Sequence, residues 1–297
     1  MPPKDLTALF VLSALWGSSF LFMRIAAPAL GPVLLIELRV LIAGLALLAF
    51  ALATRSLPEF RSRWKHFLVI GVINSALPFV LIATAELHIT ASLAATLNAT
   101  TPLFGALAAA LWLGERLTWG KGVGLLLGLL GVAVLVGLGP VALTPAVWLS
   151  IGASLLGALS YGVAAVYTRR NMKGAPPLAL ALYSQLLAAG VLLPGVPFTW
   201  PGEAPSGVVV ASVLALALLS TAVAYLLYFG LIQRVGPTKA TMVTYLSPAF
   251  GILWGAALLR EPLSVWTFVG FGLILVSVAL ITGVRLRGPE ARASTSG

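Results

Sequence analysis

Two stretches of the sequence decide the fold because one repeats the other at a constant spacing. Residues 97–137 read LNATTPLFGALAAALWLGERLTWGKGVGLLLGLLGVAVLVG, and residues 243–283 read VTYLSPAFGILWGAALLREPLSVWTFVGFGLILVSVALITG. The two align without a gap at an offset of 146 residues, and 15 of 41 positions are identical. Apolar composition alone does not match a proline with a proline, as in Pro102/Pro248, or a glutamate with a glutamate, as in Glu115/Glu261. The sequence therefore indicates the duplication of one unit.

The composition around these stretches predicts a membrane protein. Of the 297 residues, 60% are hydrophobic and 9% are charged, whereas soluble domains average about 25% charged residues. Apolar runs of about 20 residues, long enough to cross a bilayer, recur along nearly the whole chain. They predict an all-α membrane protein with ten transmembrane helices, at residues 6–28, 32–53, 66–86, 91–114, 118–138, 146–168, 176–198, 207–232, 237–259 and 264–284.

The repeat offset spans five of these helices. Because five is odd, the second unit must enter the membrane with the opposite polarity. We expect a first five-helix repeat at residues 1–140, a second at residues 141–284 and a polar tail at residues 285–297. Inverted repeats are typical of secondary transporters, which bind substrate near the midplane between the repeats and alternate its access. A channel would need a continuous polar pore lining, and the scattered hydroxyl groups do not supply one.

The basic residues predict the orientation. With the N-terminus inside the cell, 15 of the 18 Lys and Arg residues fall in cytoplasmic segments, and only Arg24, Arg39 and Arg260 do not. This asymmetry follows the positive-inside rule at successive short loops. We therefore expect both termini in the cytoplasm, and we do not interpret the net charge of +10 as a nucleic-acid surface.

The duplicated motif resembles a known family. Its pattern is Pro-Leu-Phe … Gly-Glu-x-Leu-Thr … Gly, with Glu261-Pro262-Leu263-Ser264 in the second copy. Together with ALWGSSF at residues 14–20 and Arg39, it resembles the EamA-type repeats of the drug/metabolite transporter (DMT) superfamily. Within that superfamily the chain is most similar to bacterial ten-helix exporters of amino acids, including aromatic ones. The resemblance implies a multi-pass exporter of amino acids or related metabolites in the bacterial inner membrane; the alternative is a multidrug or other metabolite efflux transporter.

Prolines and polar residues at mid-helix depth predict the substrate site. Proline frees the carbonyl group four residues earlier, and polar groups inside a bilayer need partners. Such prolines can simply kink helices, but three of them beside polar side chains favour a cavity. Trp16 and Tyr161 lie too deep for interfacial anchors. We expect the substrate to contact Trp16, Ser19, Asn74, Pro78, Asn98, Thr101, Tyr161, Tyr225, Tyr245 and Ser247.

Four further residues are expected to have structural or gating roles: Arg39, Glu86, Pro102 and Pro248. A lone cation seven residues into a helix is costly in a bilayer. Glu86, on the same side of the membrane, is the candidate partner of Arg39. We favour a structural salt bridge over contact between Arg39 and a substrate carboxylate. Glu115 and Glu261 precede the candidate helix caps Thr118 and Ser264, which favours a local helix-end role for both glutamates.

Residue types and motifs that the sequence lacks restrict the possible transport mechanisms. No Asp or Glu lies in the middle of a predicted span, so the sequence offers no carboxylate for proton coupling. There is no ATP-binding motif and no cysteine, and the two histidines, His66 and His88, lack ligand spacing. We therefore expect no enzyme activity, metal or cofactor. The predicted partners are a small-molecule substrate and lipid, and the predicted protein is a monomer that works passively or by exchange.

Overall fold

A computed structural model of the chain describes residues 1–116, 118–139, 142–240 and 242–282. In these residues the chain is helical and contains no strand. The helices are α1 (Pro3–Leu30), α2 (Pro32–Ala53), α3 (Trp64–Gly71), α4 (Leu77–Ala85), α5 (Ala91–Asn98), α6 (Thr101–Leu113), α7 (Trp119–Gly137), α8 (Pro145–Asn171), α9 (Pro177–Leu192), α10 (Gly207–Leu214), α11 (Ala224–Val235), α12 (Pro237–Ala240), α13 (Val243–Leu259) and α14 (Val265–Thr282).

Several of these helices continue one another. Short 3-10 helices, Arg61–Arg63 and Leu193–Phe198, precede α3 and extend α9, and π-helical segments join α3 to α4 and α10 to α11. Within the described part of the chain, nine helical segments are long and apolar enough to cross a membrane, and α13 is a shorter apolar helix. These ten segments match the ten predicted spans, so the predicted fold class is confirmed. The end of the last predicted span, at residues 283 and 284, lies outside the described residues.

The fourth predicted helix is interrupted, contrary to the prediction of one helix at 91–114. It ends as α5 at Asn98 and resumes as α6 at Thr101, with Pro102 in the first turn of α6. Proline fits a first turn because no helical N–H is needed there. The Thr101 hydroxyl donates a 2.8 Å hydrogen bond to the Asn98 carbonyl. Pro248 instead lies inside α13.

The two π-helical segments reveal the duplication inside the bundle. They span Val72–Ala76 and Ala215–Val223, and the repeat offset of 146 places the first at 218–222, within the second. A π-helical turn widens the helix by one residue and occurs frequently at functional sites. Equivalent local distortions in both repeats indicate that they belong to the duplicated unit.

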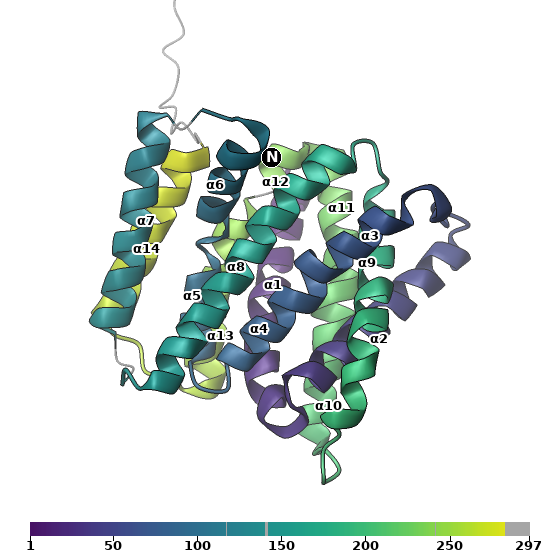
Figure 1. Cartoon of the computed structure of the whole chain (residues 1–297), viewed down its shortest axis with the longest axis horizontal. Coiled ribbons are helices and arrows are strands. Elements are labelled where there is room, and N and C mark those ends of the chain that lie inside the picture. Colours follow the sequence, from purple (N-terminus) through teal and green to yellow (C-terminus); the bar gives the residue numbers. More distant parts are fainter. Residues whose placement is uncertain (117, 140–141, 241, 283–297) are drawn as a thin grey trace, which may run out of the picture.

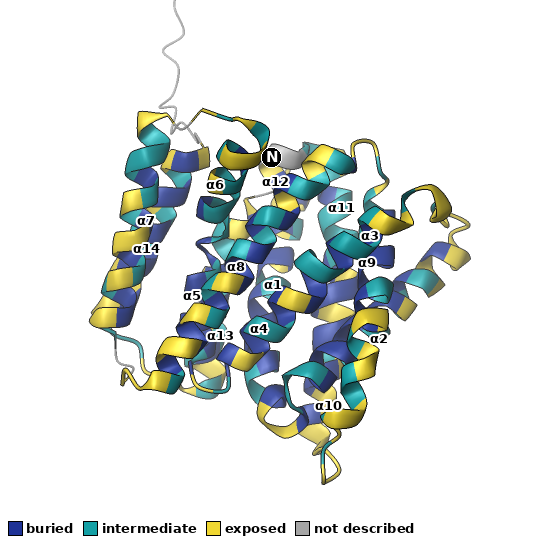
Figure 2. Cartoon of the chain, in the orientation of Figure 1, coloured by how far each residue is buried: buried dark blue, intermediate teal, exposed yellow. Residues whose placement is uncertain are grey.

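The helices pack as a bundle with one separate pair (Figure 1). Helices α7 and α14 pair along one side, while α1 packs against α13, α2 against α9, and both α4 and α6 against α8. Buried residues face the helix contacts and exposed ones the outer flanks (Figure 2). The flanks are apolar, as at Trp119, 88% exposed, and Leu149, 76% exposed. A soluble protein rarely exposes so continuous an apolar surface, so these flanks are the lipid-facing surface.

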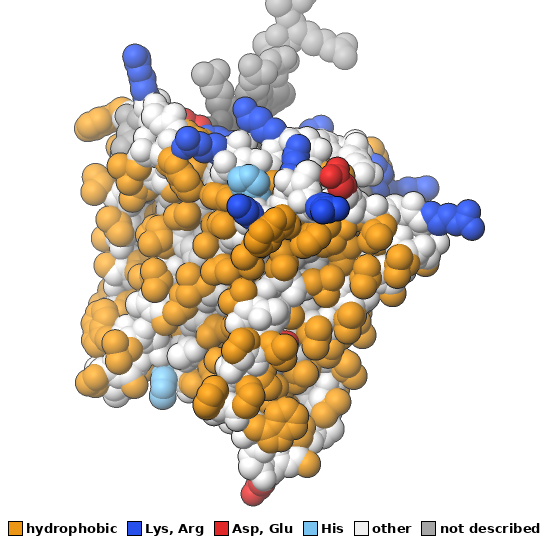
Figure 3. Space-filling view, turned by 45° about the vertical axis from the view of Figure 1, so that its right-hand side comes forward, with side chains coloured by type: hydrophobic (Ala, Val, Ile, Leu, Met, Phe, Trp, Pro, Cys, Tyr) orange, Lys and Arg blue, Asp and Glu red, His pale blue; other side chains and the backbone are white. Residues whose placement is uncertain are grey.

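The two ends of the bundle differ in charge. Lys and Arg side chains gather at the end where the chain begins (Figure 3). We call this the basic end; the adjoining ends of α2 and α3, of α6 and α7, of α8 and α9, and of α11 and α12 also lie there (Figure 1). The opposite end holds the α1–α2, α4–α5 and α13–α14 connections.

Candidate functional site: a central cavity between the repeats

A cavity of about 490 Å³ lies at the centre of the bundle. Its walls come from α1, α2, α9, α11, α13 and the helices around them, so both repeats contribute. Helices α7 and α14 contribute nothing to the lining that the structure describes. A volume in this range suits a small organic molecule.

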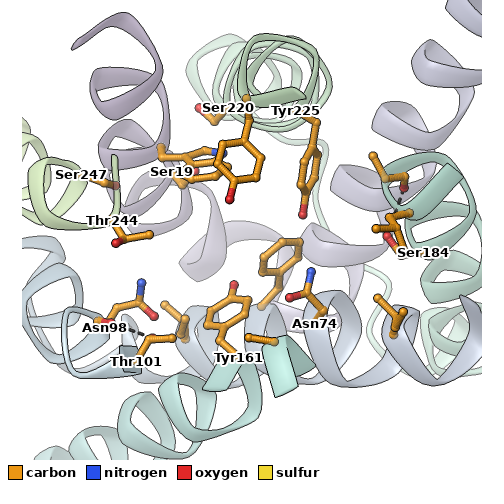
Figure 4. Close-up of a pocket in the computed structure, with 18 of the residues that line it drawn as sticks. Ser19, Asn74, Asn98, Thr101, Tyr161, Ser184, Ser220, Tyr225, Thr244 and Ser247 are labelled. Atoms are coloured by element: carbon orange, nitrogen blue, oxygen red, sulfur yellow. Dashed lines mark hydrogen bonds between the residues drawn. The ribbon is translucent and has the colours of Figure 1, made fainter. Parts of the chain in front are cut away.

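Most of the predicted contact residues line this cavity. Those that do are Trp16, Ser19, Asn74, Asn98, Thr101, Tyr161, Tyr225 and Ser247. Figure 4 shows Asn98, Thr101, Tyr161 and Asn74 along one wall of the cavity, with Tyr225 facing them from the opposite wall. Arg39, Pro102 and Pro248, which we had expected to be structural or gating residues, also form part of the lining.

Two predicted contact residues lie elsewhere. Pro78 is buried beneath the lining, and its carbonyl faces Gly157 of α8. Tyr245 lies outside the cavity because its hydroxyl donates a 2.8 Å hydrogen bond to Thr282 of α14. Proline at mid-helix and polarity at mid-depth do not reveal which face a side chain occupies.

Aromatic rings make up much of the wall. Trp16 contacts Tyr225 edge-on, with ring centroids 6.4 Å apart, and contacts Tyr228 at 5.1 Å. On the other side, Phe79 meets Tyr161 edge-on at 6.1 Å. Such geometries are favourable for aromatic pairs. The result is a largely apolar chamber with a few polar groups directed into it, the usual composition of a small-molecule site.

Two of the polar groups are unpaired or only partly paired within the described part of the chain. The Asn98 side-chain oxygen is buried and accepts no hydrogen bond within the described part of the chain. Arg39 is 5% exposed; its Nε donates a 3.1 Å hydrogen bond to Thr221, and its Nη1 approaches the Met23 sulfur at 3.6 Å. The guanidinium carbon lies 3.6 Å from the centre of the Phe79 ring.

The predicted salt bridge between Arg39 and Glu86 is wrong for this structure. Among the described residues, ion pairs join Glu115 to Lys121 and Arg169, and Asp5 to Arg234. The Glu86 side chain is fully buried, and both its carboxyl oxygens lack hydrogen-bond partners in this part of the chain. The Glu86 backbone carbonyl accepts a hydrogen bond from Arg24.

The sequence analysis missed several lining residues, among them Met23, Phe79, Ser184 and Ser220. Ser220 could have been found, because it lies 146 residues after Asn74 and thus occupies the equivalent position of the second repeat. Asn74 lies in one π-helical segment and Ser220 in the other. The other three carry no signal in the sequence that separates them from ordinary core residues.

The cavity is closed toward the opposite end. There α1, α5 and α13 approach one another closely through small residues. A Cβ atom placed on Gly17 would lie 2.6 Å from the Ser247 carbonyl oxygen, and one on Gly251 would lie 2.5 Å from the Ala95 Cβ. Neither glycine can be enlarged without separating helices.

A carboxylate strengthens the same closure. Glu261, after α13, accepts hydrogen bonds from the backbone N–H groups of Ala91 and Ser92, at 2.7 and 2.9 Å, and from the Ser92 hydroxyl at 2.5 Å. These donors form the start of α5, where acceptors are needed and negative charge is favoured. Glu261 therefore caps a helix of the other repeat, and the predicted local role is wrong. Thr118 and Ser264 do cap their own helices.

Toward the basic end the cavity is open. Its exposed lining residues include Ala165 of α8 and Thr244 of α13, both in the parts of these helices nearer that end. The lining residues toward the opposite end, Phe20, Met23 and Phe79, are all buried. A solute can thus reach the cavity from the basic end.

The duplicated helical unit, the apolar flanks and the one-sided cavity define a multi-spanning membrane transporter. Residues 5–137 and 148–283 each match the EamA-like transporter family, and the chain belongs to that family.

The similarity to named relatives covers nearly the whole chain. The "Uncharacterized inner membrane transporter YedA" of Escherichia coli (strain K12) is 32% identical over 283 residues, 93% of this chain and 89% of the relative. The "Probable terminal-alkyne amino-acid exporter" of Streptantibioticus cattleyicolor is 29% identical over 299 residues, 99% of this chain and 98% of the relative. A solved structure named "Crystal structure of protein" is similar in fold, with a TM-score of 0.67 at 21% identity, covering 96% of this chain and 98% of that chain.

Proposed function

We propose that the protein exports amino acids or related small metabolites across the bacterial inner membrane. The observation that carries this proposal is a cavity of amino-acid size built by both repeats and open at one end only. Inverted repeats can exchange conformations, which would close the basic end and open the other. The basic end is the cytoplasmic one by the positive-inside rule, so both termini are cytoplasmic and the present conformation faces inward.

The cavity chemistry supports an amino-acid substrate over a lipophilic cation. Aromatic and apolar surface suits a side chain, while Arg39 and Asn98 offer a donor and an acceptor to a zwitterion. No Asp or Glu belongs to the described lining. Multidrug efflux of organic cations, the alternative, would have to place a cation beside Arg39 without a carboxylate in the described lining to compensate. The amino-acid exporter among the relatives supports the same choice for this chain.

The same absence of lining acids supports passive transport or exchange. Proton-coupled transporters use titratable carboxylates or histidines within the spans. We therefore expect flux down a substrate gradient, without stimulation by a pH gradient.

The test is a flux assay in proteoliposomes with a panel of labelled amino acids, with and without a pH gradient. The structure offers matched tyrosines. Tyr161→Phe removes a hydroxyl from the cavity, whereas Tyr245→Phe removes one that bonds Thr282 outside it. We expect Tyr161→Phe to lower flux about three- to tenfold, the range for one hydrogen bond, and Tyr245→Phe to retain wild-type flux. The absence of amino-acid flux in the wild type would refute the proposal, and a rate that rises with a proton gradient would refute the passive mechanism.

A further inference from the structure

The guanidinium group of Arg39 has more donors than the protein uses. Arginine carries five N–H donors, but this one bonds Thr221 through Nε and meets only a thioether through Nη1. A thioether is a weak acceptor. The side chain is 5% exposed and lines the cavity. A buried cation without an anion is costly, so its retention calls for a compensating partner.

The second repeat shows that the charge is not needed for helix packing. Gln185 lies 146 residues after Arg39, and Ser75 lies 146 residues before Thr221. Gln185 Nε2 donates a 3.0 Å hydrogen bond to the Ser75 hydroxyl, as Arg39 Nε does to Thr221 at 3.1 Å. Each bond joins one repeat to the other. A neutral amide makes the equivalent bond, so the positive charge of Arg39 must serve another purpose.

The contacts around Arg39 leave one edge of its guanidinium group available to bind a ligand. Phe79 covers a face of the group, with the ring centre 3.6 Å from Cζ, and Thr221 fixes Nε. Stacking and the Nε bond orient the planar fork, and the terminal nitrogens keep only one weak contact, from Nη1 to the Met23 sulfur at 3.6 Å. Those two nitrogens match the two oxygens of a carboxylate, which arginine binds in a bidentate manner. Gln185, in contrast, is not part of the lining.

We propose that Arg39 binds the carboxylate of the transported solute and thereby restricts transport to carboxylate-bearing metabolites. This inference rests on the proposed function, since it assigns the substrate class of the same cavity. The solute carboxylate supplies the anion that the described cavity lining lacks, and the aromatic walls receive the remainder of the molecule. Removing the carboxylate from a solute leaves a buried cation unpaired, which is why recognition discriminates against neutral analogues.

The test compares ligand pairs that differ only in the carboxylate. The purified full-length protein is titrated with L-phenylalanine and L-phenylalaninamide, and with 3-phenylpropionate and 3-phenylpropionamide, and binding is measured by thermal shift and by calorimetry. We expect the carboxylate of at least one pair to bind wild type on the order of tenfold or more tightly than its amide. Arg39→Gln, which copies the chemistry of Gln185, should bring the two members of that pair to equal affinity. Arg39→Lys should retain part of the preference.

The matched control is Gln185→Met, which breaks the equivalent bond between the repeats without touching the cavity. It should leave the carboxylate preference unchanged. Because the readout is a ratio within one protein, a general loss of stability does not imitate the effect. The inference is overturned if Arg39→Gln keeps the wild-type ratio, or if neither carboxylate outbinds its amide in wild type. Binding of phenylpropionate but not phenylalanine would support the role of Arg39 and count against amino acids as the substrate.

Discussion

Two glutamates occupy equivalent positions of the duplicated unit and have different surroundings. Glu261, at the opposite end, accepts three hydrogen bonds from the first residues of α5. Glu115, its equivalent 146 residues earlier, lies at the basic end with its side chain 36% exposed. It pairs with Lys121 at 3.3 Å and with Arg169 at 2.5 Å. The same position of the duplicated unit thus bonds the other repeat in the second copy, as Glu261, and lies exposed at the basic end in the first copy, as Glu115.

The two surroundings coincide with the closed and the open end of the cavity. The cavity is shut where Glu261 joins the second repeat to α5, and open toward the end where Glu115 pairs with Lys121 and Arg169. Ser92, which donates two of the bonds to Glu261, is equivalent to Thr238 by the repeat offset. If the repeats exchange conformations, as proposed, Glu115 should accept from the chain at residue 238, and Glu261 should lose Ser92. The glutamate contacts would then stabilise the two states in turn.

The largest effect should come from enlarging the closed contact itself. Gly17→Ala places a methyl group 2.6 Å from the Ser247 carbonyl oxygen and the Phe250 Cβ, and 2.8 Å from a backbone nitrogen. Backbone atoms cannot yield, so α1 and α13 must separate, at a cost of about 1–3 kcal/mol for such overpacking. We expect flux to fall at least tenfold and the melting temperature to drop. Gly152→Ala is the control, because nothing lies within 4 Å of the added atom. Equal behaviour of the two variants would show that the contact is not tight.

The spans were predictable from the sequence, and the two glutamates show where prediction stops. Apolar length alone predicts ten crossings, and polar and aromatic residues at mid-depth identify part of the cavity wall. The role of Glu261 depends on α5, which precedes it by 163 residues at its closest end, and no local pattern reports that contact. The placement of Tyr245 in the cavity was wrong for a related reason. Its partner Thr282 belongs to α14, and the sequence does not specify how that helix packs. The sequence correctly indicated that Arg39 is buried within a span. Whether it pairs with Glu86 depends on the distance between the two side chains, which the sequence does not give.

Neutralising Glu261 or Glu115 should have a smaller effect. The two substitutions should change access to the cavity from the opposite end in opposite directions. The chain has no cysteine, so Ser19→Cys in the cavity can report access to a membrane-impermeant thiol reagent. Glu261→Gln weakens charge-assisted bonds worth about 1.5–3 kcal/mol each and should increase labelling from the opposite side about tenfold. Glu115→Gln removes a contact of the alternate state, so labelling from that side should fall.

Vesicles of known orientation supply this measurement, with the Ser19→Cys protein itself as the reference. That protein should label mainly from the basic end. A change in the same direction in both variants would contradict the reciprocal roles of the two glutamates. Loss of labelling from both sides would indicate a damaged cavity instead, which the melting temperature of each variant reports separately.

The smallest effect concerns the pH dependence of the stability that Glu115 contributes at the basic end. The hydrogen bonds from Arg169 and Lys121 hold the pKa of Glu115 below its ordinary value of 4.5. A carboxyl group with a depressed pKa stabilises the folded state fully above its ordinary value, and this stabilisation is lost as the pH falls through the depressed pKa. The melting temperature difference between wild type and Glu115→Gln should therefore be constant from pH 7 to 5 and shrink only below 4.5. The difference should be small, since exposed ion pairs contribute about 0–1 kcal/mol, and added salt should reduce it. Glu203→Gln, at an exposed residue outside the three ion pairs of the described chain, is the control; a matching pH profile there would assign the effect to general surface charge rather than to Glu115.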